Sequence, residues 1–205
     1  MEKEKPVPAV KFSDVLIALI LGTIFAIVGV HYFGNTADRK LMHAVQNSDA
    51  PAVRTALEEG ANPNTYIWPD RPLLIEAVET ENAIVVDYLL LWGANVDVST
   101  SRDPGKTPLF SAVFRNNLLI TRMLLEAGAD ANMIVNPESG LTLIMVAVQQ
   151  KEIGFHKDIR ILKLLLRHGG NATAKDAEGK TAMMIAREHK NTEAISVLKD
   201  HLGIK

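Results

Sequence analysis

The chain has 205 residues, of which 47% are hydrophobic and 22% charged, the balance of a folded protein rather than a disordered one. Its formal net charge of −2 gives no basic field, so nucleic acid is not expected as a partner. Cysteine is absent, which excludes disulfides, thiolate nucleophiles and the common structural zinc sites without choosing a compartment.

The first predicted element is an apolar segment near the N-terminus. Residues 15–33, VLIALILGTIFAIVGVHYF, carry no formal charge and follow Asp14. As a helix they would extend about 28 Å, close to the roughly 30 Å of a bilayer's hydrocarbon core. A cleavable signal fits less well because the stretch is long and no small-x-small site follows, and a buried domain helix fits less well because every face is apolar. The sequence therefore predicts a tail at 1–14, a single transmembrane helix at 15–33 and a linker at 34–38.

The flanking charges favour one orientation of this segment. Three lysines precede it, whereas two basic residues, Arg39 and Lys40, follow it, so the short tail is expected in the cytoplasm. In a Gram-negative bacterium this describes a single-pass inner-membrane protein with its folded part in the periplasm, although a difference of one lysine leaves the reverse orientation open. Ala18, Gly22 and Ala26 form a small-residue stripe, which is either chance or the face of a weak homodimer through the transmembrane helix.

The rest of the chain is periodic. A helix-opening motif recurs at spacings of 33, 35, 35 and 39 residues, marked by the alanines Ala44, Ala77, Ala112, Ala147 and Ala186. A glycine follows sixteen residues after each of the first three alanines and twenty-two after the fourth; these glycines are Gly60, Gly93, Gly128 and Gly169. Between them lie leucine-rich segments with helical spacing. The pattern predicts a repeat architecture, in which the glycines are placed to end helices in the left-handed conformation.

The motifs PLFSAV and EAGADAN, with Thr107 and Pro108 placed to open a helix, resemble the ankyrin repeat. The resemblance implies an all-α solenoid at 39–205, with about five helix-turn-helix repeats and hairpin loops at approximately 39–69, 70–104, 105–139, 140–178 and 179–205. Thr142 and Thr181 keep the capping hydroxyl in later copies. One departure is systematic, because the family's histidine is replaced by large apolar residues that should pack between neighbouring repeats: Met42, Ile75, Phe110, Met145 and Met184.

The resemblance also implies that a protein partner binds a concave face made by hairpin tips and first helices. The first hairpin carries Tyr66, Ile67 and Trp68, which are either interface anchors, a cover for the first repeat or contacts to a nearby bilayer. Further candidates lie on the second hairpin, at the end of the third repeat's first helix, on the third hairpin and in the enlarged loop at 151–158. They are Arg102, Asp103, Phe114, Arg115, Ile134, Val135 and Phe155.

Motifs for catalysis are missing from the sequence. It contains no His-Glu-x-x-His pair, no phosphate-binding glycine loop and no Gly-x-Ser-x-Gly turn, so we expect no enzyme activity, cofactor or metal. The sequence predicts a membrane-anchored interaction module that binds or inhibits a protein partner. On the periplasmic side it would be an immunity protein against a toxin or an accessory factor for an enzyme; the alternative is a cytoplasm-facing scaffold that recruits proteins to the inner face of the membrane.

Overall fold

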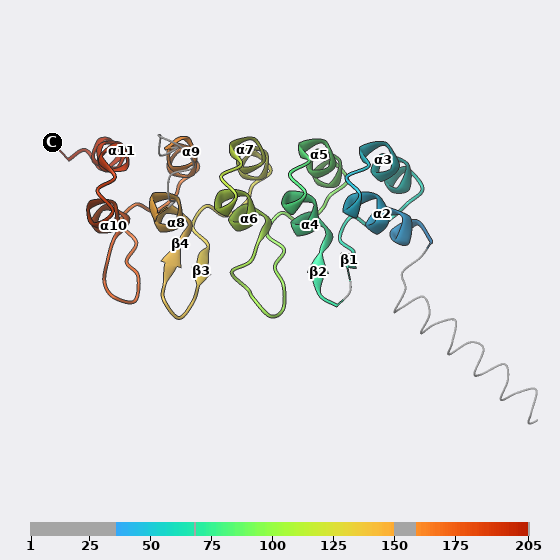
Figure 1. Ribbon diagram of the computed structural model, residues 1–205, viewed down its shortest axis with the longest axis horizontal. Helices are drawn as coiled ribbons and strands as arrows, with labels where there is room; N and C mark the ends of the chain where they lie inside the picture. Colours follow the sequence, from blue (N-terminus) through green and yellow to red (C-terminus); the bar gives the residue numbers. More distant parts are fainter. Residues whose placement is uncertain (1–35, 68, 150–158, 205) are drawn as a thin grey trace, which may run out of the picture.

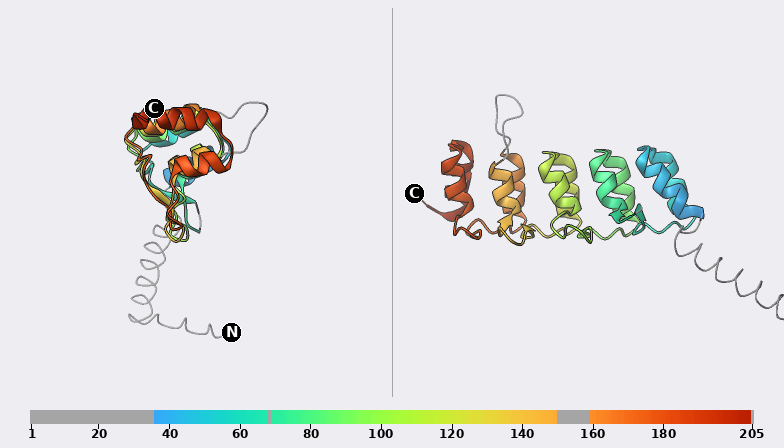
Figure 2. Two further views of the ribbon diagram at one scale, coloured as in Figure 1. Left: turned by 90° about the vertical axis from the view of Figure 1, so that its left-hand side faces the viewer. Right: turned by 60° about the horizontal axis from the view of Figure 1, so that its bottom comes forward.

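The computed structural model describes residues 36–67, 69–149 and 159–204, which form a row of two-helix units (Figure 1). The first helices of the units lie in one row and the second helices in another, and hairpins project from the first row away from the second. Seen along the solenoid, the units superpose (Figure 2). The helix pairs are α2 (Thr36–Gln46) with α3 (Ala50–Glu58), α4 (Leu73–Glu79) with α5 (Ala83–Leu91), α6 (Pro108–Phe114) with α7 (Leu118–Glu126), α8 (Leu143–Gln149) with α9 (Arg160–Arg167), and α10 (Ala182–Glu188) with α11 (Thr192–Leu202).

Two of the hairpins contain short antiparallel strands. In the first, β1 (Tyr66–Ile67) pairs with β2 (Arg71–Pro72), and Tyr66 lies opposite Pro72. In the third hairpin, β3 (Ile134–Asn136) pairs with β4 (Leu141–Thr142), with a register shift between Ile134 and Asn136. The prediction of a helical repeat fold is confirmed, and the strands only stiffen the connections.

Side chains cap the N-terminal ends of most helices, although α4, which follows Pro72, has no such cap. The Thr107 hydroxyl accepts a hydrogen bond from the Phe110 N–H at 3.2 Å, and Thr142 and Thr181 cap α8 and α10 in the same way. Four second helices begin instead at asparagine or aspartate; the Asn117 side chain, for example, accepts from the Ile120 N–H at 3.1 Å. Helix α9 begins after Ile159, which provides no side-chain cap. Each capping side chain satisfies an amide that has no partner within its helix. The predicted threonine caps are therefore confirmed.

Left-handed residues mark the turns. The glycines predicted to end second helices all have positive φ, from 83° at Gly93 to 94° at Gly128. A second left-handed position lies between the two helices of a unit, and there it is occupied by residues with side chains: Ser48, Glu81, Asn116 and Lys190, with φ between 52° and 58°. Only asparagine among these tolerates that conformation well, so the other three carry backbone strain.

Replacing Lys190 with glycine should therefore stabilise the fold by roughly 0.5–1 kcal/mol, because glycine adopts the left-handed conformation without a Cβ clash. Lys190 is exposed, so little packing is lost. The free energy of unfolding by urea would measure the gain. Lys199→Gly, inside α11, is the control and should destabilise by about 1 kcal/mol. An equal loss of stability from both substitutions would contradict the backbone strain at Lys190.

Polar side chains join neighbouring units at the base of the hairpins. The Asn64 side-chain oxygen accepts the Asn95 N–H at 2.7 Å, and Asp97 accepts the Asp130 N–H at 3.0 Å. Asn132 repeats the contact with the N–H of Asn171 at 2.7 Å. These bonds hold each hairpin against the next, while buried leucine, valine, isoleucine and alanine side chains form a continuous core between the helices.

Two details differ from the sequence-based expectation. Helix α2 begins at Thr36, so the expected linker at 34–38 overlaps the first helix. At the family's histidine position, Ile75 and Met145 are buried as expected and Met42 and Phe110 are half-buried, but Met184 is 49% exposed. The prediction that Met184 is buried was wrong. Its burial would need a following repeat unit, and α10 belongs to the last described helix pair.

None of the described helices is both long enough and apolar enough to cross a membrane. The predicted transmembrane segment at 15–33 and the tail at 1–14 lie outside the described residues. So do Trp68 and the enlarged loop with Phe155.

Candidate functional site

A groove of about 750 Å³ opens on the hairpin side of the third and fourth units. Its apolar lining comes from α6, β3, β4 and α8, and its rim from the tips of two hairpins. The apolar residues are Phe110, Phe114, Val135, Leu141 and Val146. The remaining residues are Arg102, Asp103, Pro104, Asn136, Pro137, Glu138 and Gln149. An apolar floor with a polar rim is the composition of protein-binding surfaces.

Phe114 is the most exposed apolar residue of this groove. It is the last residue of α6, its side chain is 69% exposed, and its ring lies 5.7 Å from that of Phe110. The same position of the other first helices is polar, with Gln46, Glu79, Gln149 and Glu188. The fold therefore does not require an apolar side chain here, and the exposed ring is available to a partner.

The width of the groove depends on Gly105. A Cβ added there would lie 1.6 Å from the Val135 carbonyl oxygen, so the backbone of the third hairpin packs directly on this glycine. Val135 in turn lines the groove. Gly105 thus sets how closely the second and third hairpins approach each other.

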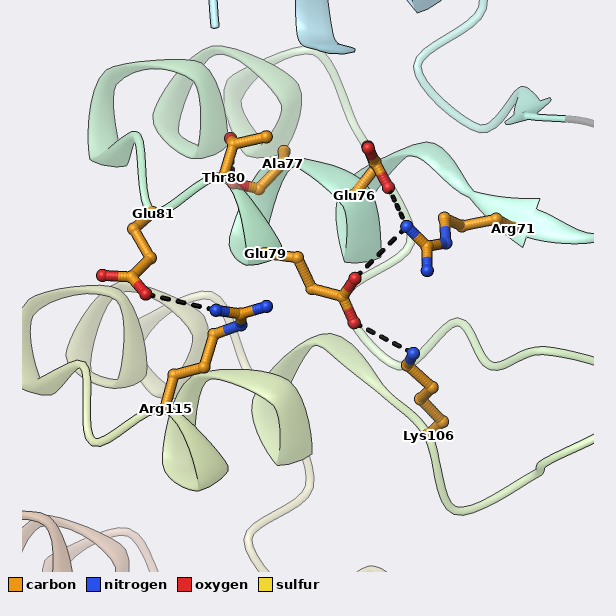
Figure 3. A network of polar contacts seen from close by, with 8 residues as sticks. All are labelled: Arg71, Glu76, Ala77, Glu79, Thr80, Glu81, Lys106 and Arg115. Carbon is orange, nitrogen blue, oxygen red and sulfur yellow. Dashed lines mark hydrogen bonds and ion pairs between the residues drawn. The ribbon is translucent and has the colours of Figure 1, made fainter.

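Beside the groove, the second and third units are joined by ion pairs (Figure 3). Glu79 contacts Lys106 at 3.0 Å and Arg71 at 3.3 Å, and Arg71 also binds Glu76, whose hydrogen bond raises the pKa of the Arg71 guanidinium. Arg115 pairs with Glu81 at 3.3 Å. Because the Glu79 side chain is only 17% exposed, these contacts hold the two units in one register. The concave face therefore changes from charged at the second unit to aromatic at the third.

Four of the residues proposed from the sequence meet in the groove: Arg102, Asp103, Phe114 and Val135. Arg115 follows Phe114 and is held by Glu81. Ile134 is 51% exposed and does not line the groove, whereas the next two residues of β3, Val135 and Asn136, do. The sequence placed Ile134 and Val135 at a hairpin tip, but they lie in strand β3.

The first hairpin is separate from the groove. Tyr66 is 47% exposed and Ile67 is half-buried, and both lie in β1 rather than at a tip. Phe110, Leu141 and Val146 are groove residues that the sequence analysis did not select. The sequence predicts packing between repeats for Phe110. The signal for its place in the groove is a second phenylalanine, Phe114, four residues later on the same helix, and the half-buried Phe110 ring lies beside it.

Asp70 connects the first and second hairpins and should respond to pH. It accepts hydrogen bonds from the Ser101 hydroxyl and, at 2.8 Å, from the Ser101 N–H, and these lower the pKa of Asp70. A carboxylate with a lowered folded-state pKa stabilises above its unfolded pKa of about 3.9 and loses that contribution as pH falls through the folded value. Asp70→Asn should therefore be less stable than the unaltered chain at neutral pH and match it in strong acid. Unfolding midpoints of the two chains, measured from neutral pH to strong acid, should converge as the pH falls. A difference that stays constant with pH would contradict the role of the Asp70 carboxylate.

Within the described part of the chain, no group of three or more histidine, aspartate or glutamate residues could hold a metal ion. The site offers shape, aromatic surface and charge for recognition. Stacked helix pairs with a free groove define a repeat scaffold of the kind that binds other macromolecules.

The chain belongs to the ankyrin repeat family, since a family model described as ankyrin repeats (3 copies) matches residues 41–135 and 128–205. An ankyrin repeat-containing protein of Treponema pallidum is 33% identical over 150 residues, 73% of this chain and 47% of that protein. Inversin of Gallus gallus is 31% identical over 116 residues, 56% of this chain and 10% of inversin. Ankyrin repeat and SOCS box protein 2 of Bos taurus is 34% identical over 102 residues, 45% of this chain and 14% of that protein. The chain thus spans less than half the length of each of these relatives. Ankyrin repeats serve generally as modules for protein–protein interaction rather than as enzymes.

Proposed function

We propose that this chain binds a protein partner through the groove between its third and fourth repeats. The observation that carries the proposal is Phe114, an exposed aromatic ring beside Phe110 at a position that is polar in the other four repeats. Aromatic anchors in apolar pockets with polar rims dominate the binding energy of protein interfaces. Arg102, Asp103 and Glu138 at the rim would orient the partner by charge.

The proposal includes attachment to a membrane by residues 15–33, supported by their length and lack of charge. The repeats would face the periplasm of a bacterial inner membrane, and the alternative is a scaffold facing the cytoplasm. Alkaline phosphatase fused after Lys205 tests the side, because the enzyme is active only when exported. Activity supports the periplasmic arrangement, whereas a silent fusion with an active cytoplasmic reporter supports the scaffold. The stripe at Ala18, Gly22 and Ala26 would allow a weak homodimer within the membrane.

Outside the cytoplasm, the partner would be a toxin that the chain neutralises, as an immunity protein does, or an enzyme such as catalase that needs an accessory factor. Affinity purification of the full chain from membranes tests the binding itself, with a Phe114→Asp variant purified in parallel. A partner retained by the unaltered chain and lost from the variant supports the groove. Equal recovery from both chains contradicts it. A neighbouring toxin gene would favour the immunity role.

A further inference from the structure

The face opposite the hairpins carries a pattern of its own. The second helices α3, α5, α7, α9 and α11 lie side by side in one row (Figure 1). On the first four of these helices, three exposed positions lie nine, six and two residues before the helix-ending glycine. We call the outward positions of α5, α7 and α9, together with Trp92 at the end of α5, the outer face: Ile84, Asp87, Leu91, Trp92, Leu119, Arg122, Glu126, Arg160, Lys163 and Arg167.

The outer face is apolar and aromatic at α5. Ile84 is 58% exposed and Leu91 is 69% exposed. Trp92, the residue after the helix, is 39% exposed, and its ring meets that of Tyr88 edge to face at 6.3 Å. Tyr88 also packs against the core, whereas Ile84, Leu91 and Trp92 do not belong to it. Helix α5 buries Val85, Val86 and Leu89 instead.

At α9 the outer face is cationic. All three outward positions are basic, namely Arg160, Lys163 and Arg167, and each is exposed. The inward side of α9 is isoleucine and leucine, and its eight residues include no acid. Helix α7, between them, combines Leu119 with Arg122 and Glu126. The acids Asp87 and Glu126 are outnumbered by the four cations, so the outer face is basic as a whole.

We propose that the outer face rests on an anionic lipid surface. Tryptophan and tyrosine concentrate at the interface of a bilayer, leucine and isoleucine enter its boundary, and lysine and arginine are attracted to anionic headgroups. The proposal rests on the membrane attachment proposed above, because the apolar segment at 15–33 ends only two residues before α2 and keeps the repeats near the bilayer. With the second helices against lipid, the hairpins and the groove face away from the membrane and stay open to a protein partner.

Trp92 supplies the reporter, because the chain has only two tryptophans. In a Trp68→Phe background, the full chain is reconstituted into vesicles of neutral or anionic phospholipid, with and without lipids brominated near the headgroup end of the acyl chain. Bromine quenches tryptophan fluorescence only at contact distance. We expect loss of Trp92 fluorescence in anionic brominated vesicles, weaker loss in neutral ones, and recovery as salt is raised.

Charge variants test whether the cations of α9 are responsible. Lys163→Glu with Arg167→Glu should restore the fluorescence of Trp92 in anionic vesicles. The control is Arg102→Glu with Lys175→Glu, which makes the same change in net charge on the hairpin side and should leave the quenching intact.

Flotation of the vesicles separates this inference from the attachment on which it rests. A chain that floats with the vesicles but shows no quenching of Trp92 overturns the lipid contact and leaves the attachment standing. A chain that does not float overturns both. Absence of quenching together with self-association through α5 would assign the apolar surface to a second copy and also overturn the lipid contact.

Discussion

Replacing Gly105 with alanine should lower the free energy of unfolding by about 3 kcal/mol, the upper end of what overpacking costs. The added Cβ would lie 1.6 Å from the Val135 carbonyl oxygen, and a backbone atom cannot move aside by rotating a side chain. The third hairpin must shift, and with it the groove that Val135 lines. Urea unfolding followed by circular dichroism gives the loss, with a midpoint on heating lower by roughly 5–10 °C.

Gly60→Ala is the matched control. Its φ is +88°, so alanine meets the left-handed penalty, but no atom lies within 4 Å of the added Cβ. A loss of only about 1–2 kcal/mol is expected there. If the two variants are equally stable, the close contact between Gly105 and Val135 does not exist and the groove is not set by it.

Phe114→Asp should separate binding from folding. Because the side chain is 69% exposed, its replacement should change stability by no more than about 0.5 kcal/mol. If the ring is an interface anchor, its loss should weaken partner binding by at least 2 kcal/mol, or about 30-fold in the dissociation constant. Titration of the purified partner against the membrane-reconstituted chain measures the change.

Gln46→Asp provides the comparison for this variant. Gln46 occupies the position in the first repeat that Phe114 occupies in the third, and it is also exposed. The substitution adds the same charge to the same face at a distance from the groove, so binding should be unchanged. A 30-fold loss from both variants would show a general effect of charge rather than an anchoring ring.

Much of the fold is predictable from the sequence because each landmark has a local physical cause. Thr107 caps α6 because a threonine before a helix accepts an amide hydrogen bond. Gly128 ends α7 because glycine adopts the left-handed conformation without strain. Isoleucine and leucine at helical spacing identify the buried side of α9 without knowledge of its neighbours, whereas Leu119 of α7 is exposed. The repeat period then arranges these units in a row.

The groove was only half predictable, because it depends on contacts between distant residues. Arg102 and Phe114 could be selected as exposed, but nothing local shows that the second hairpin meets Val135 across Gly105. Ile134 and Val135 are neighbours in β3, yet only Val135 lines the groove, beside a register shift that the sequence does not reveal. The sequence does not identify Phe110 as a groove residue, because its side chain both packs against the core and lines the groove.

Site-specific photo-crosslinking in cells would show whether a protein occupies the groove. A photoreactive phenylalanine analogue replaces Phe114 in the full chain, and a second chain carries it at Ser196, an exposed position on α11 far from the groove. If the groove is the binding site, position 114 gives a discrete covalent adduct with a protein and position 196 gives none. The absence of an adduct at 114, or the same adducts at both positions, would contradict the assignment of the groove as the binding site.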